Sequence, residues 1–189
     1  MRARSRWDGT VALWAASALL AACASLPMDT PEQRRDSALA VIVHWSNFSS
    51  LTARRVMEDH GPPDRIASGS VEWDARGPWT RIVVRDEPPY YDSRLGPDNL
   101  EHTVAYPVPE ERLERLAAFS GKVRVSKDRG SLTSLAVSEE LNVLALNLAH
   151  EVIIGAKNPA EARDYYERVL LLSTSGKSSP YMQGLIFRK

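Results

Sequence analysis

Hydrophobic side chains recur at the spacing of an amphipathic helix in several segments of this chain. Residues 30–33, Thr-Pro-Glu-Gln, have the form of a capping box with proline at the first helical position, so a helix is expected to begin there. Ser49 or Ser50 can cap a second helix, which Gly-Pro-Pro at 61–63 ends. Residues 158–161, Asn-Pro-Ala-Glu, repeat the capping pattern and predict a late helix.

The most hydrophobic helical pattern follows Ser138 and ends at Gly155. Apolar residues cover most of the circumference of this segment, and Asn142, Asn147 and His150 interrupt them. A helix that is apolar on nearly all sides is normally buried. We therefore expect this segment to be the central helix of the core.

Alternation of apolar and polar residues, the pattern of a strand with one buried face, appears between these helices. The segments are 71–75, 79–85, 100–106, 123–125 and 132–137, and residues 182–187 can add a last edge strand. In the first hairpin, Glu72 and Asp74 can pair with Arg81 and Arg85 across the strands. Together these patterns predict a single α+β domain over residues 30–189. Antiparallel hairpins pack against the buried helix, and two helices precede the sheet.

The N-terminus has a different hydrophobic pattern. Arg2, Arg4 and Arg6 precede an almost entirely apolar run from Val11 to Ala22. A membrane-spanning helix needs roughly 20 apolar residues, and this run is shorter. We therefore expect residues 1–22 to be a secretory signal peptide.

The apolar run ends in Leu20-Ala21-Ala22-Cys23, which contains the only cysteine of the chain. This tetrapeptide resembles the lipobox of bacterial lipoproteins. The resemblance implies that the Cys23 thiol takes a diacylglyceryl group with fatty chains such as palmitate, and that the chain is cut before Cys23. Residues 23–29 would then be a lipidated tether, and the domain would face the periplasm. An ordinary signal peptide with a chance cysteine is the alternative.

Two further features bear on the location. Ala24 follows the cysteine where an aspartate would resemble an inner-membrane retention signal, which favours the outer membrane in a Gram-negative host. Residues 51–85 show the order helix, Gly-Pro, strand with tryptophan, turn and strand. This order is similar to lipoproteins of the SmpA/OmlA type, which assist outer-membrane protein assembly. The later two-helix segment departs from that small family.

Composition narrows the range of partners. The chain has 24 basic and 24 acidic residues, and removing residues 1–22 leaves 21 and 23, a net charge of −2. A charge so close to zero does not favour nucleic acid or an anionic lipid surface as a partner. No cysteine is left for a disulfide, so packing must stabilise the domain. No cofactor is expected.

A long proline-containing loop, residues 86–99, displays two adjacent tyrosines, Tyr90 and Tyr91. Loops of this length in compact domains are usually functional or disordered. Tyr90 and Tyr91 are therefore the candidate contact surface for a partner. In the alternative interpretation, both rings lie on the surface of the core.

Motifs for metal or phosphate binding are incomplete. The segment that begins with His150 and Glu151 starts like a zinc-protease motif, but Ile154 stands where the second histidine is needed, so no metal site is expected. Gly176-Lys177-Ser178 ends like a phosphate-binding loop, but Leu171 replaces the first glycine of that motif.

Four polar residues that interrupt apolar patterns can meet in space: His102, Asn147, His150 and Glu151. A buried histidine with a carboxylate can serve in acid–base catalysis. The same residues can equally form a hydrogen-bonded core network, which we favour.

These observations lead to one expected function and two alternatives. The first is a membrane-anchored, non-enzymatic envelope lipoprotein that binds an envelope protein or a cell-wall component, or serves as an accessory protein. The second is a lipid-anchored hydrolase or metal-dependent enzyme that uses His102 and His150, with Glu151 nearby. The third is a carrier of a small apolar ligand.

Overall fold

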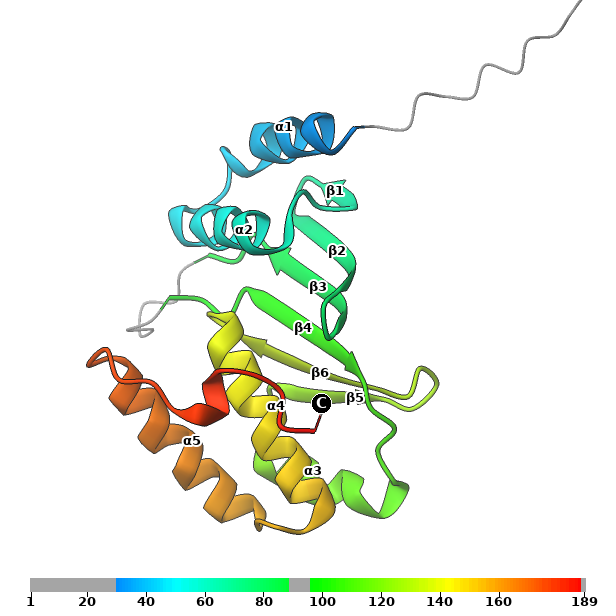
Figure 1. The fold of residues 1–189 in the computed structure, drawn as a ribbon, viewed down its shortest axis with the longest axis vertical. Helices are drawn as coiled ribbons and strands as arrows, with labels where there is room; N and C mark the ends of the chain where they lie inside the picture. Colours follow the sequence, from blue (N-terminus) through cyan, green and yellow to red (C-terminus); the bar gives the residue numbers. More distant parts are fainter. Residues whose placement is uncertain (1–29, 89–95, 188–189) are drawn as a thin grey trace, which may run out of the picture.

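The computed structural model describes residues 30–88 and 96–187, which form an α+β fold with one antiparallel sheet (Figure 1). The expected fold class is confirmed, including the two N-terminal helices. Cys23, Tyr90 and Tyr91 lie outside the described residues. The helices are α1 (Pro31–Ile42), α2 (Asn47–His60), α3 (Leu113–Phe119), α4 (Glu139–Ile154) and α5 (Pro159–Ser173), with short 3-10 turns η1 (Glu110–Arg112) and η2 (Pro180–Met182). In the part of the chain that is described, none of these helices is long and apolar enough to cross a bilayer.

The sheet has six strands in the order β1-β2-β3-β4-β6-β5, and each neighbouring pair is antiparallel. The strands are β1 (Arg65–Ala67), β2 (Ser70–Arg76), β3 (Trp79–Arg85), β4 (Leu100–Ala105), β5 (Val123–Ser126) and β6 (Ser131–Ala136). Both expected hairpins, β2–β3 and β5–β6, are present. β4 joins them by pairing with β3 and β6, which makes one continuous sheet.

Helix starts follow the side-chain caps in the sequence. Thr30 and Asn158 each form the expected capping box with the residue three positions later. The second helix starts earlier than expected, because Ser46 rather than Ser49 or Ser50 is its cap. The Ser46 hydroxyl accepts a hydrogen bond from the Ser49 amide, and the Ser46 amide donates to the Asp86 side chain. Ser46 therefore both caps α2 and ties its start to the segment after β3.

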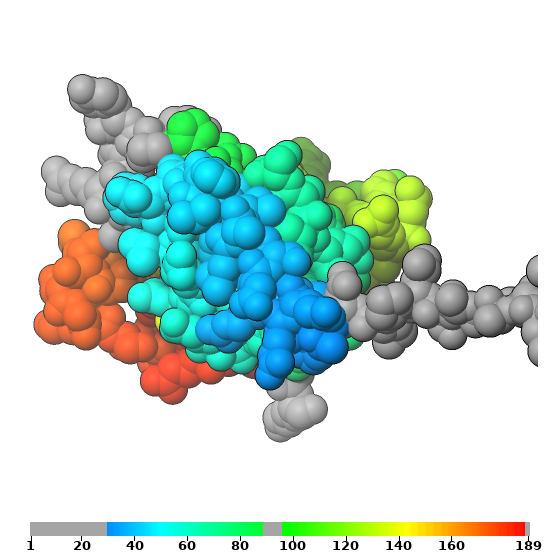
Figure 2. Space-filling model, turned by 90° about the horizontal axis from the view of Figure 1, so that it is seen from above, coloured from blue at the N-terminus to red at the C-terminus, as the bar shows by residue number. Residues whose placement is uncertain are grey.

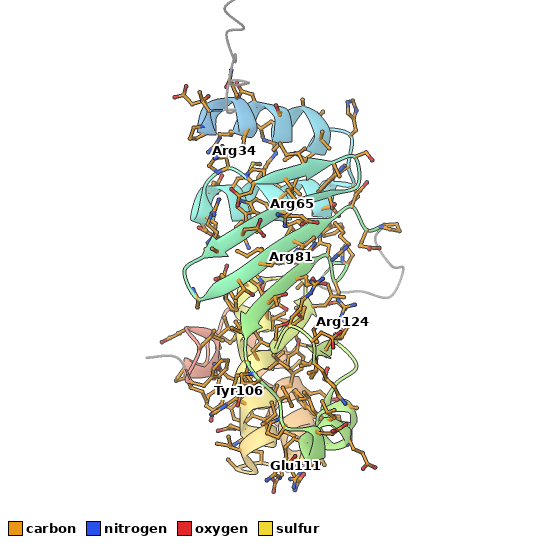
Figure 3. The ribbon with its side chains drawn as sticks, turned by 90° about the vertical axis from the view of Figure 1, so that its right-hand side faces the viewer. Arg34, Arg65, Arg81, Tyr106, Glu111 and Arg124 are labelled. Carbon is orange, nitrogen blue, oxygen red and sulfur yellow. The ribbon has the colours of Figure 1, made fainter. Side chains whose placement is uncertain are left out.

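The helices cover one face of the sheet and leave the other face open (Figures 1 and 3). Trp73, Ile82 and Leu132 point from the strands into the covered side and are fully buried. Leu144 and Leu148 of α4 are also fully buried, which confirms the expected central helix.

The open face carries paired charges. The expected Glu72–Arg81 ion pair is present at 2.8 Å. Asp74 pairs instead with Arg65 of β1, a strand that the sequence pattern did not predict because it is only three residues long. Arg85 pairs with Glu101 of β4 at 3.3 Å.

The expected edge strand at 182–187 is not formed. After η2, this segment is held by the buried Asn147 of α4. The Asn147 side chain donates to the carbonyls of Tyr181 (3.0 Å) and Gly184 (2.8 Å) and accepts the amide of Ile186 (2.9 Å). These backbone groups are therefore bonded to a side chain and not to a neighbouring strand, which explains why the alternating pattern did not produce a strand.

Candidate functional site

A groove lies between α2, the N-terminal end of α4 and residues 182–185. It encloses a cavity of about 760 Å³. In Figure 1, α2 and the red C-terminal segment lie on the same side of the sheet, with the start of α4 next to them. Seen from above in Figure 2, the cyan surface of α2 borders the orange and red surface of the C-terminal part.

The rim of the groove is hydrophobic and exposed on the α2 side. Phe48 is 49% exposed and Leu51 is 65% exposed, although both are large apolar side chains. Met182 and Leu185 line the groove from the C-terminal segment. Large exposed apolar side chains that gather at a concave surface are a mark of binding sites in general.

The charged residues of the groove are mostly acidic. Glu58 and Asp59 of α2 and Glu139 and Glu140 of α4 line it, together with Arg54 and Arg55. Four carboxylates against two guanidinium groups give the lining a net negative character. The groove therefore combines apolar surface with a preference for positive charge.

The carboxylate of Glu139 is the centre of the polar cluster in this groove. Ser138 caps α4 and thereby places Glu139 at its first position. The Trp79 indole donates to Glu139 Oε1 at 3.0 Å. Glu139 Oε2 lies 2.8 Å from His60 Nε2 and 3.3 Å from His102 Nε2. Three segments that are distant in the sequence, the end of α2, strand β4 and the start of α4, thus meet at one carboxylate oxygen.

His102 is fully buried, and Asn142 fixes its protonation pattern. The Asn142 amide nitrogen lies 2.9 Å from the Leu100 carbonyl oxygen and 3.0 Å from His102 Nδ1. Because the carbonyl can only accept, the Asn142 nitrogen faces it as a donor and has its second hydrogen for Nδ1. His102 Nδ1 is therefore the acceptor, and the ring proton lies on Nε2 toward Glu139.

The pKa values of His102 and Glu139 are both shifted to lower values, which sets the charge of each side chain. Burial lowers the pKa of His102, more than the nearby Glu139 carboxylate raises it, so the ring is neutral at pH 7. Burial alone would raise the pKa of Glu139, but the close contact with His102 and the hydrogen bond with His60 hold this pKa well below its ordinary value. The groove thus contains an ionised carboxylate next to a neutral, buried imidazole.

The structure does not bring His102 and His150 together. His102 contacts the first turn of α4 through Asn142, and His150 lies eight residues further along the same helix, about 12 Å at 1.5 Å per residue. His150 Nδ1 is 2.8 Å from the Tyr106 hydroxyl, and its ring contacts Phe187.

Asn147 and Glu151 also lie away from the groove lining. Asn147 holds the C-terminal segment, and Glu151 accepts from the Tyr181 hydroxyl and pairs with Lys157 at 3.0 Å. These contacts fit the expectation of a hydrogen-bonded core network. Three of the four residues considered together in the sequence therefore support the packing of the C-terminus, and only His102 contacts a residue of the groove lining, Glu139.

At the ends of helices, charged side chains commonly interact with the helix dipole, so neither His60 nor Glu139 stands out in the sequence as a site residue. His60 is indeed the last residue of α2 and Glu139 the first of α4. Their positions are separated by 79 residues, so no motif spacing connects them. Only the tertiary fold, which places α2 and the start of α4 on the same side of the sheet, brings the two side chains together.

Neither the protein-family models, the curated proteins nor the solved structures with which the chain was compared gave a match.

Proposed function

We propose that this protein is a lipid-anchored lipoprotein of the cell envelope that binds a segment of another envelope protein in the groove, without catalysis. The lipobox-like segment ending in Cys23 supports the anchor. The observation that carries the binding role is the groove itself, with its exposed apolar rim of Phe48 and Leu51. A segment with an apolar side chain next to a lysine or arginine suits both the rim and the acidic lining.

The proposed contact surface includes Tyr90 and Tyr91, because the flanks of their loop attach beside the groove. Ser49 of α2 donates through its hydroxyl to the Glu87 carbonyl. On the other flank, the ring of Phe48 lies so close to Gly96 that a Cβ at Gly96 would be 3.0 Å from it. Both flanks therefore lie at the N-terminal part of α2, next to the rim.

Site-specific photocrosslinking tests the groove. A photoreactive amino acid replaces Leu51 in the full lipidated chain, and membranes are irradiated. We expect a discrete protein adduct whose yield falls when Glu140→Gln removes one negative charge of the lining. The matched control carries the same group at Thr80, an exposed position of β3 that lies beside Arg81 and Thr103 on the open face, and we expect no adduct there.

Other outcomes of this experiment count against the proposal. An adduct with peptidoglycan would replace the protein partner by a cell-wall component. An adduct with a small apolar molecule would support the carrier alternative. Equal adducts at Leu51 and Thr80, or none at either position, would remove the groove as the contact site.

The cluster of His60, His102 and Glu139 favours a second candidate function, a lipid-anchored hydrolase or metal-dependent enzyme. A histidine paired with an ionised carboxylate in a groove is an arrangement used for acid–base chemistry. In this version His60 and Glu139 replace His150 and Glu151 as the partners of His102. Hydrolysis of a model ester or peptide that disappears in Glu139→Gln, but persists in His150→Ala, would favour the enzyme over the binding protein.

A further inference from the structure

We infer that His60, His102 and Glu139 form a binding site for a divalent transition metal, with Zn²⁺ as the best-suited ion. The candidate ligand atoms of these residues all lie within 4.8 Å of one another. Two imidazoles and one carboxylate are a donor set that suits Zn²⁺ at a site with an open position. This inference does not depend on the proposed partner of the groove.

The distances within the cluster are close to those of a metal site. Zinc binds histidine nitrogen and carboxylate oxygen at about 2.0–2.2 Å, so neighbouring ligands of a tetrahedral site are about 3.3 Å apart. Glu139 Oε2 is 2.8 Å from His60 Nε2 and 3.3 Å from His102 Nε2. Movements of a few tenths of an ångström, together with an approach of the two rings, are enough to surround an ion.

His102 provides the second, independent observation. Its side chain is fully buried and its Nε2 faces Glu139 Oε2 at 3.3 Å, a contact whose geometry falls short of a well-aligned hydrogen-bond partner. A buried polar atom without such a partner costs free energy unless a ligand satisfies it. A metal ion at the cluster would bond to the Nε2 lone pair once the ring proton has moved to Nδ1.

The surroundings of Glu139 and His102 suit metal ligands. Trp79 donates to Glu139 Oε1 and so leaves Oε2 for the ion, the kind of outer contact that orients ligating carboxylates. Binding through His102 Nε2 requires the ring proton to move to Nδ1, where it needs an acceptor. Asn142 Oδ1, which is buried without a hydrogen-bond partner in the described structure, can serve if the amide turns over. The turn replaces the hydrogen bond to the Leu100 carbonyl by a contact between two acceptor oxygens, a cost that metal binding has to offset.

The open position of the site faces the groove. His60 and Glu139 line the cavity, whereas His102 lies behind them in the core. Three protein ligands therefore approach the ion from the protein side, and the fourth position is left for water or for a donor group of a bound molecule.

Cobalt titration tests the metal site, because Co²⁺ in a tetrahedral site has a visible absorption that free Co²⁺ lacks. The full chain, without a polyhistidine tag and in detergent micelles, is titrated with CoCl₂ and then with ZnCl₂. We expect one equivalent of tetrahedral Co²⁺, displaced by Zn²⁺. His60→Ala and Glu139→Gln should each weaken binding at least 100-fold, and Trp79→Phe should weaken it about 10- to 100-fold.

The matched control is His44→Ala, which removes an exposed histidine outside the cluster and should leave the affinity unchanged. Circular dichroism of each variant verifies folding, and His102 itself is not substituted because its side chain fills the core. The inference is overturned if the full chain shows no tetrahedral cobalt spectrum, in which case the cluster holds only protons. It is also overturned if neither His60→Ala nor Glu139→Gln weakens the binding.

Discussion

At the scale of single residues, buried polar side chains decide where segments without regular structure lie. The Asn147 side chain forms the hydrogen bonds that a neighbouring strand would otherwise form with residues 181–186. It donates two of these bonds and accepts one. Asn142 acts on a regular strand instead, because its amide nitrogen bonds to the Leu100 carbonyl and to His102 Nδ1 of β4. The sequence pattern identified both asparagines as interruptions of an apolar helix, but only their contacts reveal what each one holds.

Asn147→Leu should destabilise the protein strongly, because it keeps the approximate size of the side chain and leaves the carbonyls of Tyr181 and Gly184 and the amide of Ile186 without partners. At about 1–3 kcal/mol for each buried group left unpaired, discounted for partial exposure, we expect a loss of about 2–4 kcal/mol in the free energy of unfolding. Urea unfolding measures it. Asn47→Leu, at an exposed position of α2, is the control and should change stability by less than about 0.5 kcal/mol. Similar losses in both variants would contradict this role of Asn147.

At the scale of elements, α4 organises the molecule along its length. Its first turn supplies Glu139 to the groove and Asn142 to the buried His102. Its middle holds the C-terminal segment through Asn147, and its last turns contact that segment again through His150 and Glu151. The helix was predictable because its hydrophobicity extends all round and Ser138 and Gly155 mark its ends. The polar residues face different neighbours because successive helical positions point in different directions.

The contact between η2 and α4 predicts a pH dependence at alkaline pH. The hydrogen bond to Glu151, with a contribution from burial, raises the pKa of Tyr181 from 10.0 to about 12. A tyrosine whose folded pKa is raised stabilises the fold fully below pH 10, and this contribution is lost as the pH rises through about 12. Urea unfolding between pH 9 and 12 should therefore show a smaller decline in stability for Tyr181→Phe than for the parent protein.

Tyr166 accounts for part of the decline that remains in that variant, because burial raises its pKa to about 12 as well. Tyr106, whose pKa is raised by burial, contributes in the same direction. An identical decline in the parent protein and in Tyr181→Phe would mean that the hydroxyl of Tyr181 is not held by Glu151 in solution.

At the scale of the whole molecule, the fold separates two surfaces. One face of the sheet is open and carries a network of compensating charges centred on Glu72 and Glu101. The other face is covered by helices and contains the groove with its histidine–glutamate cluster. If the chain is held at a membrane through its N-terminus, the orientation of the domain determines whether a partner meets the open face of the sheet or the groove.

The proposed attachment is tested by Cys23→Ser. Serine keeps the shape of the processing site but cannot form the thioether, so the variant should lose fatty-acid labelling and leave the membrane fraction. Two or more acyl chains, at about 0.8 kcal/mol for each buried methylene, hold a protein firmly in a bilayer, so the difference should be large. Fractionation with radiolabelled palmitate measures both properties. A Cys23→Ser protein that stays in membranes would contradict the lipoprotein assignment, and Ala24→Ser is a control that should behave like the parent.

The sequence by itself determined the fold class, the buried central helix, both hairpins and the capping boxes, because each depends on side chains within a few positions of one another. It also supplied the expectation of a lipid anchor at Cys23. The tertiary structure alone decided that His60, His102 and Glu139 meet and that His150 turns to Tyr106. Local periodicity shows which face of an element is buried, but it does not show which other element covers that face. The order of the strands, and the placement of α2 and the start of α4 on one side of the sheet, set those distant contacts.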